Sequence, residues 1–322
     1  MRPSEDELIA RFFAPLAGEG GFALKDDVAR IAPPPGRELA LTVDALVAGV
    51  HFFAEDAPEA IARKALRVNL SDLAAKGAEP LGFLLALALP GDWREDWLEA
   101  FAEGLGDDAR AYGCPLLGGD TVETLGPLTV SITAFGAVEP GAMPLRTAAR
   151  PGDRLYVSGT IGDAALGLKL RLGQGPALPE PFPGFLIGRY LLPEPRLGLA
   201  RALRSARAAM DVSDGLVGDL AKMLRASGVA GELDLRAVPL SPAARAFLAA
   251  EPAAIEIAAT GGDDYEVLAA IAPEQCAAFE AAAAAARIVV CAIGRVSEGA
   301  GLSILGLDGA PARFERQSYS HF

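Results

Sequence analysis

Residues 69–80 read NLSDLAAKGAEP, and residues 210–216 read MDVSDGL. Each stretch holds a Ser-Asp pair among small and apolar residues. The first lies in a helix that we expect to begin at Pro58, so Asn69 and Asp72, three residues apart, share one face of that helix. The second lies between an expected strand and an expected helix. Strands alternate with helices on both sides of these stretches, which favours an α/β or α+β fold.

Apolar periodicity and turn residues predict the other elements. A capping box at 4–7 opens the first helix, and the basic, turn-rich stretch 140–151 is the best candidate for a domain boundary. The stretch 173–184, rich in Pro and Gly, is expected to be an exposed loop. The expected helices span 4–16, 58–77 and 95–111, with others beginning near 162 and 214 and an Ala-rich one between the last two strands. The expected strands span 38–43, ending at Asp44, and 81–89, 127–137, 153–159, 209–212, 264–272 and 286–294.

Composition excludes several classes of protein. The 322 residues are 51% hydrophobic and long enough for two domains, yet hold no apolar run of the roughly 18 residues that span a membrane. The net charge of −13 repels nucleic acid and anionic lipid. The first residues carry acids and no signal-peptide pattern, so we expect a cytoplasmic protein. The three cysteines form neither a disulfide framework nor a zinc pattern.

Six acidic segments share one character, which is a carboxylate beside glycine, beside serine or at a strand end. Mg²⁺ prefers such hard oxygen ligands and often combines one or two carboxylates with substrate phosphates. Glycine beside the acid lets a phosphate approach the backbone. The segments therefore predict a site for magnesium and a nucleotide polyphosphate. They are Lys25-Asp26-Asp27, Thr42-Val43-Asp44, Asn69-Leu70-Ser71-Asp72, Gly118-Gly119-Asp120-Thr121, Asp211-Val212-Ser213-Asp214-Gly215 and Gly261-Gly262-Asp263-Asp264-Tyr265.

Each acidic segment taken alone also has a plain structural interpretation. Asp214 before a helix is typical of an N-cap, Gly-Gly-Asp at 118–120 is typical of a turn, and Asp-Asp at 26–27 is typical of a solvated loop. The prediction of a site therefore depends on the number of segments and their order along the chain.

Other catalytic devices are absent from the sequence. It holds no P-loop and no protein-kinase motifs, and Gly159–Asp163 is too short for a dinucleotide fingerprint. Only two histidines occur, His51 and His321, and no serine elbow or Cys/His pair is evident. Covalent catalysis is therefore not expected, and no catalytic residue distinct from the metal ligands is predicted.

Taken in order, the motifs resemble those of the thiamine-monophosphate kinase family, from the first helix to the last residue. NLSDLAAKGA and DVSDGL mark a wider superfamily that includes aminoimidazole ribonucleotide synthetase, selenophosphate synthetase and a hydrogenase-maturation protein. TVDALVAGVHF (42–52), GGDDYE (261–266) and the final HF are more specific to the thiamine enzymes. The other matching segments are DDVA (26–29), KALRVNLSDLAAKGAEP (64–80), LGGDT (117–121), PGDRLYVSGTIGDAALGL (151–168), MDVSDGL (210–216) and SYSHF (318–322).

The resemblance implies a two-domain fold of the aminoimidazole ribonucleotide synthetase type, α/β (α+β), with mixed sheets flanked by helices. An N-terminal domain, 1–140, would carry most metal ligands and the interface of a homodimer, and a C-terminal domain, 141–322, would close over the site. It also implies transfer of the γ-phosphoryl group of ATP, the co-substrate, to thiamine monophosphate with several Mg²⁺ ions. The implied partners are these two substrates and a second copy of the chain, with no nucleic acid and no membrane.

The resemblance assigns roles residue by residue. One arginine, Arg146, suits a phosphate because a guanidinium offers forked donors. An aromatic ring and an acid suit the cationic thiazolium of the substrate. The implied metal ligands are Asp27, Thr42, Asp44, Asp72, Asp120, Asp211 and Asp214. The implied ATP contacts are Gly119, Asp120, Arg146, Ser213 and Tyr112, and the implied contacts of thiamine monophosphate are His51, Asp263 and Tyr319.

Three positions depart from the family pattern. Lys25 replaces a usual glycine, Val43 stands where the family often has Thr, and Val50 replaces a common Asn before His51. Competing interpretations are a sister ATP-dependent enzyme such as aminoimidazole ribonucleotide synthetase and a catalytically decayed nucleotide-binding protein. A third is an acidic adaptor, which would show no Mg²⁺-dependent binding of ATP.

Overall fold

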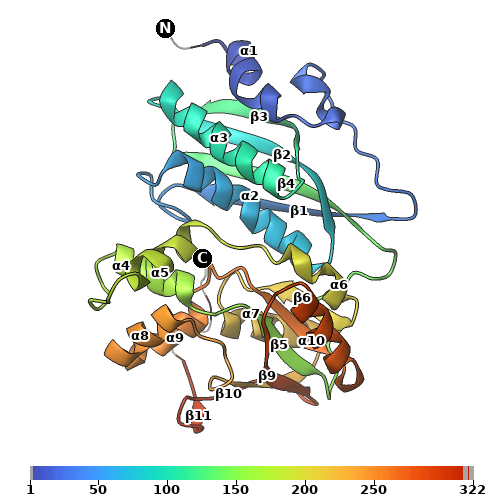
Figure 1. Cartoon of the computed structure of the whole chain (residues 1–322), viewed down its shortest axis with the longest axis vertical. Helices are drawn as coiled ribbons and strands as arrows, with labels where there is room; N and C mark the ends of the chain where they lie inside the picture. Colours follow the sequence, from blue (N-terminus) through green and yellow to red (C-terminus); the bar gives the residue numbers. More distant parts are fainter. Residues whose placement is uncertain (1–2, 315–317, 319–322) are drawn as a thin grey trace. The chain divides into compact units, whose positions relative to one another are not determined.

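The computed structural model describes residues 3–314 and residue 318. The chain divides into two compact units (Figure 1). Unit 1 comprises Met1–Leu73 and Ala78–Gly141, and unit 2 comprises Ala74–Gly77 and Ala142–Phe322. No helix among the described residues is both long enough and apolar enough to cross a membrane.

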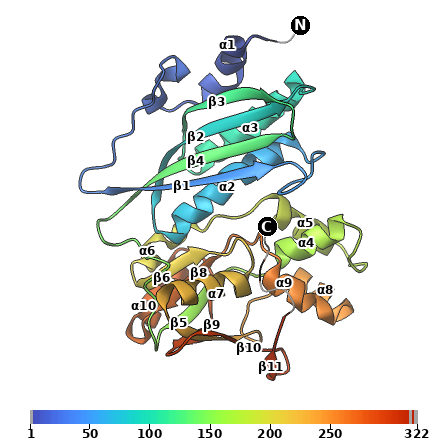
Figure 2. The ribbon, with the colours of Figure 1, turned by 180° about the vertical axis from the view of Figure 1, so that it is seen from behind.

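Unit 1 is a four-stranded mixed sheet with two helices on one face. The strands run in the order β1-β4-β2-β3, with β2 parallel to β3 and the other neighbours antiparallel. Helices α2 and α3 lie against one face, and Figure 2 shows the opposite, uncovered face of the sheet. The elements are β1 (Glu38–Val47), α2 (Pro58–Ala75), β2 (Glu79–Pro90), α3 (Glu95–Ala111), β3 (Leu116–Thr124) and β4 (Thr129–Val138).

Alternation along the strands explains why one face is covered. In β4, Val130, Ile132 and Ala134 are buried, whereas Ser131 and Thr133 between them are partly exposed. Successive side chains of a strand point to opposite faces, so the apolar set packs under the helices. Each fully buried Leu, Ile or Phe contributes about 1.5–3 kcal/mol to folding.

The N-terminal segment is helical to Leu16, as predicted, but it is not one α-helix. Only α1 (Glu5–Leu8) is α-helical, and its capping box with Ser4 is present. A π-helical turn, η1 (Ile9–Phe13), and a 3₁₀ turn, η2 (Ala14–Leu16), follow, and then η3 (Glu19–Leu24). Pro15 explains part of this change, because proline has no N–H to continue an α-helical ladder.

Strand β1 is longer than predicted, and this corrects the placement of Thr42 and Asp44. The strand continues to Val47, with Thr42 paired to Ala134 and Asp44 to Ile132 of β4. Asp44 therefore lies in the middle of a strand and not at its end. An edge strand tolerates this because an acid there reaches solvent at the rim of the sheet.

Unit 2 is a seven-stranded mixed sheet in the order β11-β10-β7-β9-β5-β8-β6. Its strands are β5 (Arg154–Ser158), β6 (Ala206–Asp211), β7 (Ala230–Asp234), β8 (Val267–Ile271), β9 (Val290–Ser297), β10 (Gly301–Leu305) and β11 (Pro311–Ala312). Its α-helices are α4 (Asp163–Arg171), α5 (Phe182–Leu191), α6 (Ala200–Leu203), α7 (Leu216–Ser227), α8 (Pro242–Ala250), α9 (Ile255–Thr260) and α10 (Cys276–Ala285). Short 3₁₀ turns are η4 (Leu197–Leu199), η5 (Pro252–Ala254) and η6 (Pro273–Gln275).

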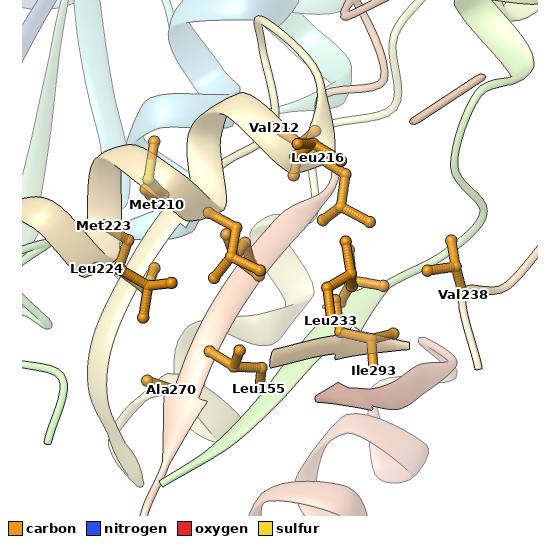
Figure 3. Close-up of a cluster of buried hydrophobic side chains, with 14 of the residues drawn as sticks. Leu155, Met210, Val212, Leu216, Met223, Leu224, Leu233, Val238, Ala270 and Ile293 are labelled. Atoms are coloured by element: carbon orange, nitrogen blue, oxygen red, sulfur yellow. The ribbon is translucent and has the colours of Figure 1, made fainter. Parts of the chain in front are cut away.

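The core of unit 2 fixes the loop between β6 and α7. Met210, Val212 and Leu216 belong to one buried cluster with Leu155 and Leu233 (Figure 3). Because apolar side chains before, within and after the β6–α7 loop are all buried, its polar residues are held at defined positions. This loop carries the second of the two Ser-Asp pairs.

Candidate nucleotide and metal site

Three predicted ligands meet where β1 passes α2 in unit 1. The hydroxyl of Thr42 donates a hydrogen bond to the Asp72 carboxylate. One turn earlier on α2, the amide oxygen of buried Asn69 accepts from the backbone N–H of Asp44 at 3.1 Å. Asn69 and Asp72 thus share one helical face, as their spacing predicted, and that face is turned to β1. We call Thr42, Asp44 and Asp72 the strand–helix group.

Three other predicted residues line a cavity of about 800 Å³ in unit 1. They are Asp27, Gly119 and Asp120, joined by Asp26 and Thr121. Ser131 and Thr133 of β4 also line it, so the cavity lies over the uncovered face of the sheet. We call Asp27, Gly119 and Asp120 the cavity group.

The strand–helix group and the cavity group lie on opposite faces of the sheet. Thr42 and Asp44 pair with Ala134 and Ile132, whose side chains are buried under the helices. Val43, the residue between them, pairs with Thr133 on the cavity face. Sequence order alone did not reveal this separation, because it depends on which residues of β1 face α2.

Backbone constraints shape the cavity group. A Cβ at Gly119 would come within 1.9 Å of the Leu85 carbonyl oxygen, so only glycine fits there. Phe22, Ala23 and Leu24, just before the Asp26–Asp27 pair, all have left-handed backbone with φ of 49°, 55° and 55°. Such conformations cost about 1–3 kcal/mol each and persist only where surrounding contacts impose them.

In unit 2, Asp211 ends β6, and the β6–α7 loop that follows holds Ser213 and Asp214. Asp211 is buried at the end of β6. The wholly buried carboxylate of Asp219 accepts from the backbone N–H of Ser213 at 3.0 Å and of Asp214 at 2.9 Å. Asp219, which no sequence motif singled out, therefore holds the backbone of this loop in place through these two hydrogen bonds. The signal for it was an acid one turn into an otherwise apolar helical face.

Lys222 joins Asp214 of this loop to Asp219 of α7. Its ammonium donates to the carboxylate of Asp214 and to Oδ1 of Asp219, the latter at 2.9 Å. Burial raises the pKa of Asp219, although the hydrogen bond and charge of Lys222 oppose it. Burial lowers the pKa of Lys222, but its hydrogen bonds and charge interactions with both acids outweigh that effect and raise it.

The segment 260–266 packs directly on this loop. The backbone N–H of Asp263, which has a φ of 63°, donates to the Ser213 carbonyl at 2.8 Å. Its neighbour Asp264 is buried and accepts from the Gly162 N–H at 2.8 Å and 3.0 Å through its two oxygens. Complete burial holds the pKa of Asp264 well above its usual range. Of the two adjacent aspartates, Asp264 is therefore a buried support of the segment.

Glu266 also holds the segment 260–266 in place. It is wholly buried and accepts from Ser158 Oγ at 2.6 Å, from Arg189 at 3.1 Å and from Arg196 Nε at 2.6 Å. No sequence pattern separates Asp264 and Glu266 from Asp263, because burial alone distinguishes these acids.

The remaining predicted residues belong to neither named group. His51 accepts through Nδ1 from the Val47 N–H at 3.0 Å, and buried Lys64 donates to its carbonyl at 3.0 Å. The ring of Tyr112 lies 5.7 Å from the Arg67 guanidinium. Arg146 is exposed on the segment that follows unit 1. Tyr319 lies outside the described residues.

The donor chemistry fits magnesium. Predicted ligands occur as carboxylates and one hydroxyl, all hard oxygens, and Asp214 already holds a cation in the form of the Lys222 ammonium. Among residues 3–314 and 318, no three His, Cys, Asp or Glu side chains gather closely enough to hold a metal by themselves. Mg²⁺ commonly uses one or two carboxylates and completes its shell with substrate phosphates and water.

Comparisons with known proteins agree with this fold. Residues 25–138 match the AIR synthase related protein, N-terminal domain, and residues 150–306 match the corresponding C-terminal domain. The thiamine-monophosphate kinase of Caulobacter vibrioides is 47% identical over 319 residues, which is 97% of this chain and 90% of that protein.

Two solved structures are similar along most or all of the chain. Thiamine-monophosphate kinase from Stenotrophomonas maltophilia has a TM-score of 0.81 and 40% identity, covering 90% of this chain and 91% of that one. AaThiL complexed with AMPPCP and TMP has a TM-score of 0.79 and 33% identity, covering 100% of this chain and 99% of that one.

The two matched domains, in this order and with this mixed-sheet architecture, define a protein of the AIR synthase related class. Within that class, identity over nearly the full length decides the assignment. The chain belongs to the thiamine-monophosphate kinase family.

Proposed function

We propose that this chain transfers the γ-phosphoryl group of ATP to the phosphate of thiamine monophosphate, giving thiamine diphosphate and ADP, with several Mg²⁺ ions. The observation that carries the proposal is the match along the whole chain to AaThiL, which was solved with AMPPCP and TMP. The all-oxygen donor groups of both units support it. The three cysteines are free thiols, which supports a cytoplasmic location.

The reaction needs no strong general acid or general base from the protein. The acceptor is already an anionic phosphate oxygen, so no proton needs to be removed from it. The obstacle is repulsion between two polyanions. When bound, magnesium supplies positive charge between them and helps to align an in-line attack.

We assign metal ions to carboxylates of each unit. The ligands are Asp27, Thr42, Asp44, Asp72, Asp120, Asp211 and Asp214, and the Thr42–Asp72 hydrogen bond fixes the direction of one carboxylate before a cation arrives. Gly119, Asp120, Arg146, Ser213 and Tyr112 bind ATP, whose phosphates can approach the backbone closely at the glycine. His51, Asp263 and Tyr319 contact thiamine monophosphate.

The same proposal includes a homodimer formed through the uncovered face of the unit 1 sheet. Leu41 and Val43 of β1, each 61% exposed, and Val122 of β3, 50% exposed, place apolar side chains on this face. Exposed apolar side chains on an uncovered sheet face are typical of an interaction surface. In this proposal the domain of residues 1–140 carries the interface, and the domain of residues 141–322 closes over the site.

The reaction is tested by following ADP formation with purified chain, ATP, Mg²⁺ and thiamine monophosphate, omitting each component in turn. We expect ADP only when all are present. ADP formation without thiamine monophosphate would point to a sister ATP-dependent enzyme, and Mg²⁺-dependent ATP binding without turnover would indicate a decayed binding protein.

The dimer is tested by light scattering on a Leu41→Glu variant. We expect the mass to fall to that of one chain. Leu307→Glu, an exposed leucine of unit 2 (50% exposed), is the control and should leave the mass unchanged. A monomeric unaltered chain would refute the dimer and leave the reaction untouched.

A further inference from the structure

One cation is already built into the proposed site. Lys222 lies on α7, two turns after Asp214, and its ammonium donates to the Asp214 carboxylate. The same ammonium is anchored by Oδ1 of Asp219 at 2.9 Å. The side chains of Lys222 and Asp214 are each about one-third exposed, at 30% and 33%, whereas that of Asp219 is fully buried.

This anchoring gives the ammonium a fixed place. Asp219 uses its other oxygen, Oδ2, to hold the backbone N–H groups of Ser213 and Asp214. The buried carboxylate therefore sets both the loop that carries Asp214 and the cation that faces it. A lysine ammonium is a compact point charge, so its position relative to an acid determines its effect.

The ammonium of Lys222 would repel a second cation at Asp214. A divalent ion that binds the Asp214 carboxylate must displace the ammonium from it or share the carboxylate with it. Two like charges about 4 Å apart repel each other at the effective dielectric of a protein surface, and salt screening reduces the repulsion. Lys222 thus opposes the binding of a divalent ion at Asp214.

We propose that Lys222 is an internal counterion that competes with divalent cations for Asp214 and weakens their binding at the β6–α7 loop. The proposal rests on the proposed function in placing a divalent cation at Asp214. It makes Lys222 a positioning residue, because it holds Asp214 in place until the cation arrives and keeps its bond to Asp219 afterwards.

The test is a titration of the full chain with Mn²⁺, followed by the electron paramagnetic resonance of the free ion at low ionic strength. Lys222→Gln removes the charge and keeps a hydrogen-bond donor. We expect it to tighten Mn²⁺ binding about three- to tenfold, in proportion to the loss of a partly exposed charge pair. In an Asp214→Asn background the same substitution should change binding less than about twofold, since its target is gone.

Arg225→Gln is the matched control. Arg225 lies on the same helix, three residues on, and is exposed. Its loss changes the net charge by the same amount, so we expect less than a twofold effect if the contact with Asp214 is what matters. Should Lys222→Gln lose its native near-ultraviolet circular dichroism, Lys222→Met, which keeps an unbranched stem, carries the same expectation.

The outcomes separate the two proposals. Unchanged or weaker Mn²⁺ binding in a folded Lys222→Gln chain overturns the counterion, and so does equal tightening by Arg225→Gln. Neither result bears on whether the unaltered chain forms ADP from ATP and thiamine monophosphate, which alone decides the reaction.

Discussion

Asp72 in unit 1 and Asp214 in unit 2 both follow a serine, but the side chains that contact the two carboxylates differ. Asp72 lies inside an 18-residue helix and accepts from the neutral hydroxyl of Thr42. Asp214 lies in a loop and faces the ammonium of Lys222. Thr42 orients a carboxylate without adding charge, whereas Lys222 adds a positive charge of its own. The same dipeptide thus places one proposed metal ligand beside a neutral hydroxyl and the other beside a cation.

Asp72→Asn should have the largest effect if the strand–helix group holds catalytic metal. We expect kcat to fall about a thousandfold, because several kcal/mol of charge stabilisation in the transition state are lost. Steady-state kinetics at saturating Mg²⁺ measures it. Asp107→Asn, an exposed acid paired with Arg63 on the helix surface, is the control and should change kcat less than about twofold. A fall of less than tenfold in Asp72→Asn would contradict the assignment.

Asp219→Ala tests whether unit 2 depends on a buried acid. The variant leaves two backbone N–H groups without their acceptor and Lys222 without its anchor, so we expect a loss of about 2–4 kcal/mol in the free energy of unfolding. Urea unfolding measures it. Asp234→Ala, where a more exposed acid pairs with Arg236, should cost less than about 1 kcal/mol. Equal losses in the two variants would mean that Asp219 is not a support.

Gly119→Ala tests the backbone approach in the cavity group. A Cβ 1.9 Å from the Leu85 carbonyl forces β2 and β3 apart, and we expect about 2 kcal/mol of destabilisation. Gly118→Ala is matched to it, because its nearest neighbour is the flexible end of Leu84 at 3.3 Å, and should cost less than about 1 kcal/mol. Comparing the urea midpoints of the two variants decides the point, and a larger loss for Gly118→Ala would contradict it.

Asp264→Asn should have the smallest effect and one that depends on pH. Burial raises the pKa of Asp264 in the folded state above its value of about 4 in the unfolded chain. The folded chain therefore binds this proton more tightly, and stability falls as the pH rises from about 4 through the raised pKa. Asparagine removes that loss, so the stability of the unaltered chain relative to the variant should decrease between about pH 4 and neutral pH. Parallel unfolding free energies across that range would contradict the direction of the shift.

Much of the fold could be predicted from local patterns. The helix over α2, the strands at β2 and β4 and the Ala-rich α10 follow from periodicity and composition. The missed elements are those whose signal is weak. Strand β3 contains two glycines and an acid, which indicated a turn, and α5 begins at Phe182 inside a stretch dominated by Pro and Gly. Tertiary pairing with β2 makes a strand of the first.

The candidate site was predictable as a set of residues but not as an arrangement. Motif order pointed to the acids, and the spacing of Asn69 and Asp72 predicted their shared face. Opposite placement of Asp44 and Asp120 on the sheet could not be predicted, since it depends on strand register. The roles of Lys222 and Asp219 could not be predicted because neither residue belongs to a motif. The contact between Lys222 and Asp214 forms only in the folded chain.

The measurement that tests the central claim most directly follows the γ-phosphoryl group itself. The chain is incubated with γ-³²P-labelled ATP, Mg²⁺ and thiamine monophosphate, and the products are separated. We expect the label in the terminal phosphoryl of thiamine diphosphate, with none there when the metal is chelated. Label appearing as inorganic phosphate while thiamine monophosphate stays unchanged would contradict direct transfer and the function proposed for this chain.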